Sequence, residues 1–240
     1  MNRTDELKNK LKNEQKHTFD SLRELVEVLR SEGGCPWDRE QTHASIRADI
    51  FEETYEVIEA IDNSDPVLLR EELGDVMFQV MFHSRIEEED GRFTVEDVIH
   101  DICEKMIVRH PHVFGTVEVS GTGEVLDNWD KIKTEEKSRK TARQAMEAVP
   151  KQLPTLMRVQ KIAKKARKDG YSFGTDAELA AKLSALTASL AEAASDEEKQ
   201  NILNEILFIS AVMSKTDTEK AVGDMTDEFI RTYESPEESK

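Results

Sequence analysis

Residues 45–90, SIRADIFEETYEVIEAIDNSDPVLLREELGDVMFQVMFHSRIEEED, decide the fold. Apolar side chains recur every three or four residues on both sides of the turn at 63–66, which is the period of an amphipathic α-helix. Asp65 is typical of a helix N-cap and Pro66 of the first helical position. The stretch therefore predicts two helices, at 45–62 and 66–90, and the short turn makes them antiparallel neighbours.

The same helical period continues in both directions along the chain. Ten glycines and six prolines are few for 240 residues, and strand-forming residues are not gathered into alternating runs. We therefore expect an all-α fold. Pro150 and Pro154 bracket the expected boundary between a first helical domain, 1–150, and a second bundle of the same kind, 151–240. The further predicted helices are 18–29, 95–109, 124–149, 156–168, 177–194, 197–213 and 218–233.

The charge of the chain excludes some classes of partner. Fifty acidic and 33 basic residues give a formal charge of −17. This acidity argues against a nucleic acid polymer or an anionic membrane surface as partner, because no basic excess is available to release counterions. An anionic substrate would need locally placed cations or a metal ion.

The sequence also indicates a compartment. No stretch approaches the roughly 18 apolar residues of a membrane span, and residues 1–16 are polar and charged, unlike a signal peptide. The two cysteines, Cys35 and Cys103, are too few for a disulfide framework. We expect a cytoplasmic protein with reduced thiols.

Five acidic residues form the candidate site. Glu52, Glu53 and Glu56 fall in one sector of the first helix, and Glu72 and Asp75 lie at the edge of the apolar stripe of the second. If the helices pair, carboxylates from both converge and repel one another unless a divalent cation neutralises them. An all-oxygen ligand set suits Mg²⁺ or Mn²⁺.

A solvated acidic face is the alternative, because acids fill about a fifth of all positions and such spacings arise by chance. Two features favour a metal site. Glu72 and Asp75 border an apolar stripe, where a merely solvated pair would more often lie opposite it. Gly74 costs about 1 kcal/mol against Ala in a helix interior, which suggests that something approaches the backbone there.

Four segments follow one another along the chain: Gly34-Cys35-Pro36-Trp37-Asp38, Glu52-Glu53-x-x-Glu56, Glu72-x-x-Asp75 and Arg109-His110-Pro111-His112-Val113-Phe114. In this order they resemble the MazG family of nucleoside triphosphate pyrophosphohydrolases. The acidic segments are shared with the wider all-α NTP pyrophosphatase superfamily, whereas the Cys-Pro-Trp-Asp and His-Pro-His segments are specific to MazG. The resemblance is close over about residues 18–160. It implies Mg²⁺-dependent hydrolysis of nucleoside triphosphates to monophosphate and pyrophosphate, with a role in clearing non-standard nucleotides.

The resemblance also assigns roles to the acidic residues. It implies that Glu53, Glu56, Glu72 and Asp75 hold Mg²⁺, or Mn²⁺ in its place. Glu52 is then the candidate to orient or deprotonate the attacking water, so Glu52 and Glu53 are the catalytic candidates.

Four further residues are assigned to the substrate in the same way. Lys105 and Arg109, four apart on one helix face, would contact phosphate. Trp129 and Lys133 match a Trp-x-x-x-Lys segment that closes over the nucleotide in the family. A base could stack on the indole of Trp129, and a packing anchor for the helix is the equally weighted alternative.

The second half of the chain reads as a degenerate tandem copy. Aligned on the acidic motifs of the first half, it retains one carboxylate of five, Glu205. We expect this half to serve packing or dimerisation. We also expect a homodimer, because isolated pairs of short helices bury too little apolar area.

Two other functions stay open at this point. One is a narrower enzyme, such as a dUTP or phosphoribosyl-ATP pyrophosphohydrolase, although the MazG-specific segments speak against both. The other is a non-catalytic helical module that binds nucleotides or a partner protein.

Overall fold

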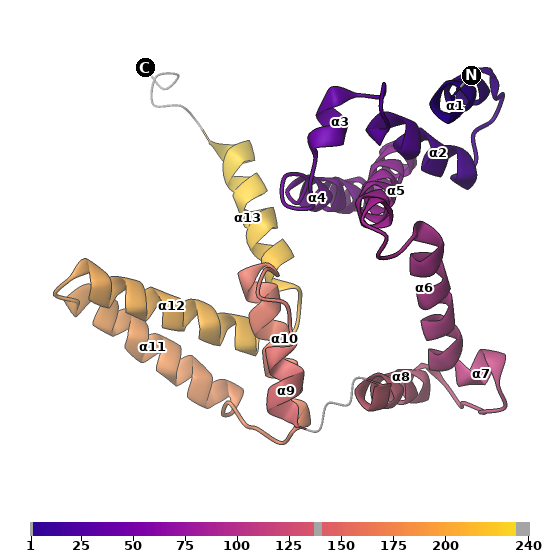
Figure 1. Cartoon of the computed structure of the whole chain (residues 1–240). Coiled ribbons are helices and arrows are strands. Elements are labelled where there is room, and N and C mark those ends of the chain that lie inside the picture. Colours follow the sequence, from indigo (N-terminus) through magenta and orange to yellow (C-terminus); the bar gives the residue numbers. More distant parts are fainter. Residues whose placement is uncertain (1, 137–140, 234–240) are drawn as a thin grey trace, which may run out of the picture. The chain divides into compact units, whose positions relative to one another are not determined.

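Figure 1 shows a computed structural model of the chain, which describes all residues except 1, 137–140 and 234–240, and leaves the side chains of 134–136 undescribed. The described residues form thirteen α-helices and no strand, which confirms the predicted all-α class. The chain divides into two compact units, Met1–Trp129 and Asp130–Lys240, and each is described by itself. None of the described helices combines the length and apolarity needed to cross a bilayer.

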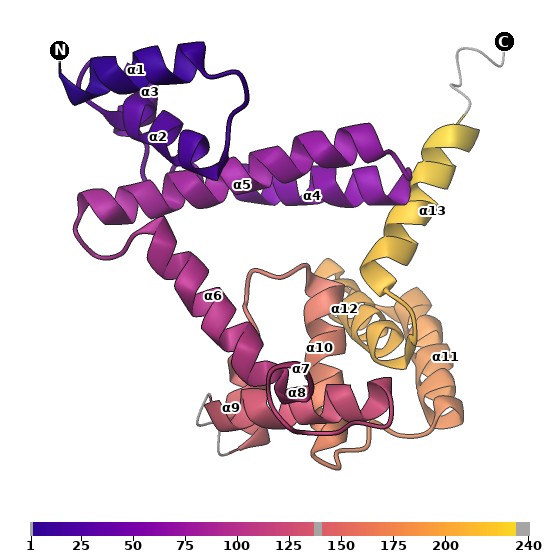
Figure 2. The ribbon, with the colours of Figure 1, turned by 90° about the vertical axis from the view of Figure 1, so that its right-hand side faces the viewer.

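The first unit is built around the helical hairpin predicted at 45–90. Asp65 accepts hydrogen bonds from the N–H groups of Val67 and Leu68, at 2.9 and 3.1 Å, which caps the second helix of the hairpin as predicted. The two helices, α4 and α5, lie side by side in Figure 2. The helices of this unit are α1 (Arg3–Asn13), α2 (Phe19–Arg30), α3 (Pro36–Glu40), α4 (Asp49–Asp62), α5 (Pro66–Glu89), α6 (Val95–Arg109), α7 (Pro111–Phe114) and the start of α8 (Thr122–Glu136).

Two helix starts differ from the sequence prediction. Helix α4 begins at Asp49 rather than at 45, because the hydroxyl of Ser45 donates to the carbonyl of Thr42 and holds this segment in turns. Helix α1 was not predicted, since it buries no residue and has no apolar stripe. Ion pairs from Arg3 and Lys10 to glutamates of α2, both at 2.6 Å, attach it to the unit.

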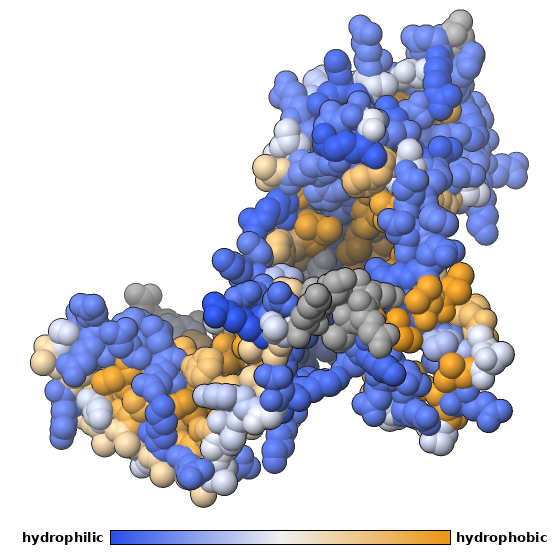
Figure 3. Space-filling model, turned by 60° about the horizontal axis from the view of Figure 1, so that its bottom comes forward, coloured by the Kyte–Doolittle hydropathy of each residue, from blue (hydrophilic) through white to orange (hydrophobic). Residues whose placement is uncertain are grey.

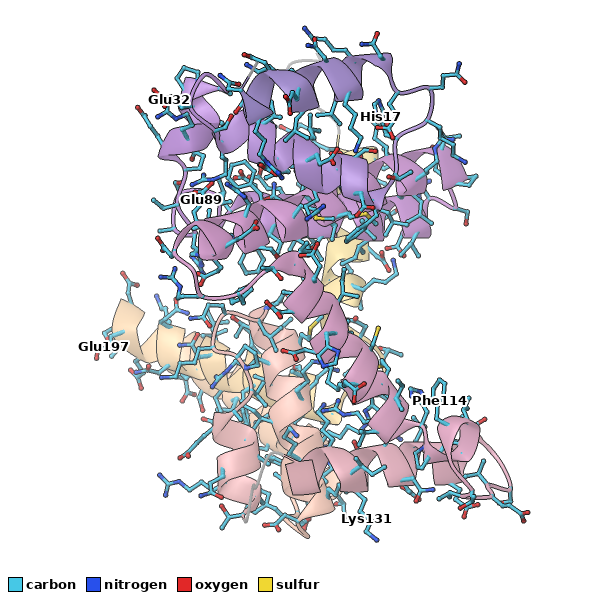
Figure 4. All side chains as sticks on the ribbon, turned by 45° about the vertical axis from the view of Figure 1, so that its right-hand side comes forward. His17, Glu32, Glu89, Phe114, Lys131 and Glu197 are labelled. Carbon is cyan, nitrogen blue, oxygen red and sulfur yellow. The ribbon has the colours of Figure 1, made fainter. Side chains whose placement is uncertain are left out.

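The hydrophobic core of the first unit lies where α2 and the start of α6 pack on the C-terminal half of α5. An ion pair of 2.8 Å joins Arg30 of α2 to Glu89 of α5, whose position Figure 4 labels. The core residues are Val26, Ile46, Met81, Phe82, Ile86 and Val95.

The N-terminal half of α5 and most of α4 lie outside this core. They pack on each other and leave a row of large apolar side chains exposed. We call this row the apolar face of the hairpin. Its members are Phe51, Tyr55, Ile58, Ile61, Leu73, Met77 and Val80.

The second unit has its own core, formed by Ala163, Leu179, Ile209 and Val212. Helices α11 and α12 form a hairpin, and α10 packs on α12. Figure 3 shows hydrophobic surface between hydrophilic side chains on this hairpin. The helices are the end of α8, α9 (Ala142–Glu147), α10 (Thr155–Lys168), α11 (Asp176–Glu192), α12 (Asp196–Met213) and α13 (Thr218–Thr232).

The helix predicted at 124–149 is not continuous. Helix α8 ends at Glu136, and the side chain of Thr141 accepts a hydrogen bond from the N–H of Gln144 and so starts α9 as a separate helix. Because α9 packs on α10, it groups with the second unit. The compact units therefore divide before the boundary expected at Pro150, and the functional division into domains 1–150 and 151–240 stays a prediction.

Candidate metal centre

Three carboxylates from two helices meet on the hairpin. Glu53 and Glu56 of α4 and Glu72 of α5 each offer an oxygen, and these oxygens all lie within 4.8 Å of one another. Helix α4 supplies two of them because residues three apart share a helix face. The side chain of Glu72 is only 7% exposed, Glu53 is half-buried and Glu56 is exposed.

The carboxylates disfavour one another's ionised form. Burial raises the pKa of Glu53, and the charges of Asp75, Glu56 and Glu72 raise it further. Burial also raises the pKa of Glu72, with added effects of Glu56 and Asp75. Asp75 thus acts on both glutamates, although it is not one of the three with the closest oxygens. A bound cation would remove this penalty by favouring the charged forms.

The donor set fits a hard divalent cation. Among the described residues, none of the three glutamates forms an ion pair with Lys, Arg or His. Carboxylate oxygens are the ligands that Mg²⁺, Mn²⁺ and Ca²⁺ prefer. The hairpin can therefore hold such an ion through Glu53, Glu56 and Glu72, with Asp75 nearby.

Glu52 and Gly74 do not join this cluster. Glu52 is exposed on α4 and is not among the carboxylates that approach one another. A Cβ atom added to Gly74 would meet nothing within 4 Å among the described residues. The space beside Gly74 is therefore open within the described part of the chain, and the expectation that something approaches the backbone there stays a prediction.

The residues assigned to the substrate are only partly brought together. The guanidinium of Arg109, which is 7% exposed, lies 5.3 Å from the ring centre of Trp129. The ring of His110 meets Trp129 edge-on at 5.0 Å, and its Nδ1 lies 2.6 Å from the carbonyl of Met106. These contacts agree with a packing anchor for the helix, and the stacking of a base on Trp129 stays a prediction. Lys105 is exposed one turn before Arg109.

The second unit lacks a comparable acidic cluster in the residues that the structure describes. Glu205 of α12 is the one carboxylate retained at a motif position. It forms an ion pair of 2.6 Å with Lys182 of α11. No group of described carboxylates forms around Glu205, which agrees with a degenerate copy.

One polar cluster gave no signal in the sequence. Nδ1 of His43 lies 2.7 Å from Nδ1 of His83, and Nε2 of His43 lies 2.5 Å from Glu87. Arg92 also donates to Glu87, and these hydrogen bonds, with that of Arg92 the larger, lower the pKa of Glu87 to about 2. His43 comes from a turn far away in sequence, so no helical spacing connects it with His83.

A comparison with known proteins matches the part of the chain that contains the acidic motifs. Residues 41–114 match the family model of the MazG nucleotide pyrophosphohydrolase domain, a range that contains the three clustered glutamates. The Thermotoga maritima protein named nucleoside triphosphate pyrophosphohydrolase/pyrophosphatase MazG is 37% identical over 223 residues, which are 92% of this chain and 86% of that protein.

Two other relatives match a smaller share of their own length. The Escherichia coli K12 nucleoside triphosphate pyrophosphohydrolase is 44% identical over 158 residues, 65% of this chain and 60% of that protein. The Bacillus subtilis protein YabN, whose name states no function, is 46% identical over 148 residues, 62% of this chain and 30% of that protein. The chain thus spans less than two thirds of these two relatives, whereas the match to the Thermotoga protein covers most of both chains. The chain belongs to the MazG family.

Proposed function

We propose that this protein hydrolyses nucleoside triphosphates to nucleoside monophosphates and pyrophosphate with Mg²⁺ held by Glu53, Glu56, Glu72 and Asp75. The observation that carries the proposal is the cluster of three glutamate oxygens within 4.8 Å of one another on two helices. Relatives named as nucleoside triphosphate pyrophosphohydrolases support it, and the match to the one from Thermotoga maritima covers 92% of this chain.

The hairpin prepares the site before substrate arrives. Packing of α4 on α5 fixes the glutamates on facing helices, and the burial of Glu72 restricts its side chain. When bound, Mg²⁺ neutralises phosphate charge and lowers the pKa of a coordinated water. In the hydrolysis, the oxygen of water bonds to the α-phosphorus, the bond from that phosphorus to the bridging oxygen breaks, and pyrophosphate leaves.

We assign to Glu52 the role of accepting the proton from the attacking water. Glu52 follows Phe51 on α4, is adjacent to Glu53 and is exposed, so it can accept a proton without being a ligand itself. This assignment separates one carboxylate that titrates during the reaction from those that stay ionised.

Donors from α6 and α8 would hold the nucleotide. We assign Lys105 and Arg109 to the phosphates and Trp129 to the base, with Lys133 completing the set. The contact between Arg109 and Trp129 supports a shared role, because it keeps a cation and an aromatic ring together.

A second copy of this chain is the partner that we propose for the apolar face of the hairpin. Seven large apolar side chains there are at least 38% exposed. A row of this kind beside a functional site marks an interface rather than a solvated surface. The second unit would then serve packing or dimerisation, and the enzyme would act on the cytoplasmic nucleotide pool to clear non-standard nucleotides.

The test is pyrophosphate release over a panel of canonical and damaged NTPs and dNTPs with Mg²⁺. Glu53→Gln and Asp75→Asn should each lower the rate by about 100-fold or more, as expected when a group that stabilises transition-state charge is lost. Glu59→Gln is the matched control, because Glu59 is exposed on α4 outside the cluster. Release that persists in both site variants would refute the acidic site.

The same panel separates the other candidate functions. A narrower enzyme would act on dUTP or phosphoribosyl-ATP alone. A non-catalytic module would release no pyrophosphate from any substrate. Its Glu53→Gln variant would bind the ligand with the same affinity as the wild type.

A further inference from the structure

The second unit contains a cleft with a volume of about 470 Å³. It is formed by the end of α8, the start of α9 and one face of α10, all within 130–169. This volume is in the range of about 300–1,000 Å³ that is typical of small-molecule sites. Its lining residues are Asp130, Lys133, Thr141, Ala142, Ala145, Lys161, Lys164, Lys165, Lys168 and Asp169, and we call it the lysine cleft.

The lysine cleft is basic in a chain of formal charge −17. Five lysines and two aspartates line it, which leaves an excess of three positive charges. Four of the lysines lie on α10 at 161, 164, 165 and 168, the spacing of one helix face. The opposite face carries Ala163 and Ala166, which are buried. The helix thus separates a packed face from a cationic one.

Part of this charge has no counter-ion among the residues that the structure describes. Lys168 pairs with Asp130 at 3.0 Å, but Lys161 and Lys164 form no ion pair with any residue that the structure describes. The hydrogen bond from Lys168 lowers the pKa of Asp130, and the charges of Lys168, Lys164 and Lys133 lower it further. The cleft therefore has a positive potential that favours anions.

Interaction with the helix dipole explains only some of these lysines. Cations in the last turn of a helix are stabilised by its C-terminal partial charge. Lys165 and Lys168 lie in the last turn of α10, whereas Lys161 and Lys164 precede it. Their position at an open cleft calls for another partner.

We propose that the lysine cleft binds a small anion with two or more linked phosphates, either free pyrophosphate or the phosphate chain of a nucleotide. Lys161 and Lys168 are seven residues apart, about 10 Å along a helix axis, which linked phosphates can follow better than a single phosphate. A nucleic acid polymer is disfavoured, because the chain as a whole has a formal charge of −17.

Binding at the lysine cleft is independent of the proposed metal centre, because no acidic residue of that centre lines the cleft. Lys133 is the one residue that the proposed function also uses, and the experiment leaves it unchanged.

The test is isothermal titration calorimetry of the full chain in EDTA, where no divalent cation supports the metal centre. The titrants are pyrophosphate, ATP, AMP, inorganic phosphate and a single-stranded oligonucleotide. Pyrophosphate and ATP should bind about tenfold tighter than phosphate and AMP, since each added charge-assisted contact contributes a factor of this order. A preference between pyrophosphate and ATP identifies which source of linked phosphates the cleft takes.

Variants of the lining lysines test whether pyrophosphate binds at the lysine cleft. Lys161→Gln with Lys164→Gln should weaken pyrophosphate binding about tenfold or more. Lys199→Gln with Lys215→Gln is the matched control, because it removes the same charge from exposed positions of the same unit. This control pair should bind as the wild type does, and circular dichroism checks that each variant stays helical.

Three results would overturn the proposal. One is the absence of pyrophosphate and ATP binding. Another is an equal loss of pyrophosphate affinity in the cleft pair and the control pair, which would show that the effect depends on net charge alone. The third is tighter binding of a single-stranded oligonucleotide through the same two lysines, which would make the site an interface for a polymer.

Discussion

Replacing Glu53 by Gln should reverse the order of thermal stability between variant and wild type when Mg²⁺ is added. Without a cation, Glu53 is repelled by the carboxylate of Glu56, and oxygens of the two lie within 4.8 Å of each other. At this separation, repulsion in water-like surroundings is about 0.9 kcal/mol. The dielectric constant of water applies because both side chains are accessible to solvent.

In EDTA at pH 8, Glu53→Gln should therefore be the more stable protein. A gain of about 1 kcal/mol corresponds to an increase in Tm of roughly 2 to 5 °C for a unit of this size. With Mg²⁺ at 100 times its Kd, the wild type gains about 2.7 kcal/mol by mass action. Glu53→Gln lacks one carboxylate ligand and should gain little, so the wild type becomes the more stable of the two.

Differential scanning calorimetry with and without Mg²⁺ measures both effects. Glu59→Gln is the control, because it removes one charge from α4 outside the cluster and should respond to Mg²⁺ as the wild type does. The reasoning is refuted if Glu53→Gln has the lower Tm in EDTA, or if Mg²⁺ stabilises it as much as the wild type.

Three further predictions concern the first unit. Phe82→Ala, at a core position that is 2% exposed, should lower the free energy of unfolding by about 3–5 kcal/mol in urea denaturation. Asp65→Ala removes the N-cap of α5 and should cost about 1 kcal/mol in the same assay, whereas Asp65→Asn should cost far less. Burial and the charge of His43 lower the pKa of His83 against a smaller opposing effect of Asp49, so the folded state binds its proton less readily than the unfolded state. Stability should therefore decline as the pH falls below about 6.5, and His83→Gln should flatten this part of the profile of Tm against pH.

Helices whose ends are set by contacts between residues close in sequence could be predicted from the sequence. Helix α6 begins and ends as predicted, because Thr94 and Asp97 form a capping box within one turn and Pro111 follows its end. Helix α1 could not be predicted in this way. The ion pairs that attach it join residues that are distant in sequence, such as Arg3 and Glu27.

The candidate site also could be predicted from the sequence only in part. Spacing selected the acidic residues of α4 and α5, since neighbours on a helix face are fixed by its period. Spacing could not decide which of them meet. Packing of α4 on α5 brings Glu72 to Glu53 and Glu56 and leaves Glu52 exposed.

The sequence by itself determined the all-α class, most helix bounds, the acidic residues and the family, because these depend on contacts within a few turns of chain or on motifs. Only the tertiary structure decided which charges face one another. It joins His43 to His83 and gathers the lysines of α10 with Lys133 at one cleft. The physical reason is that electrostatic interaction depends on distance in space, and packing between helices sets that distance.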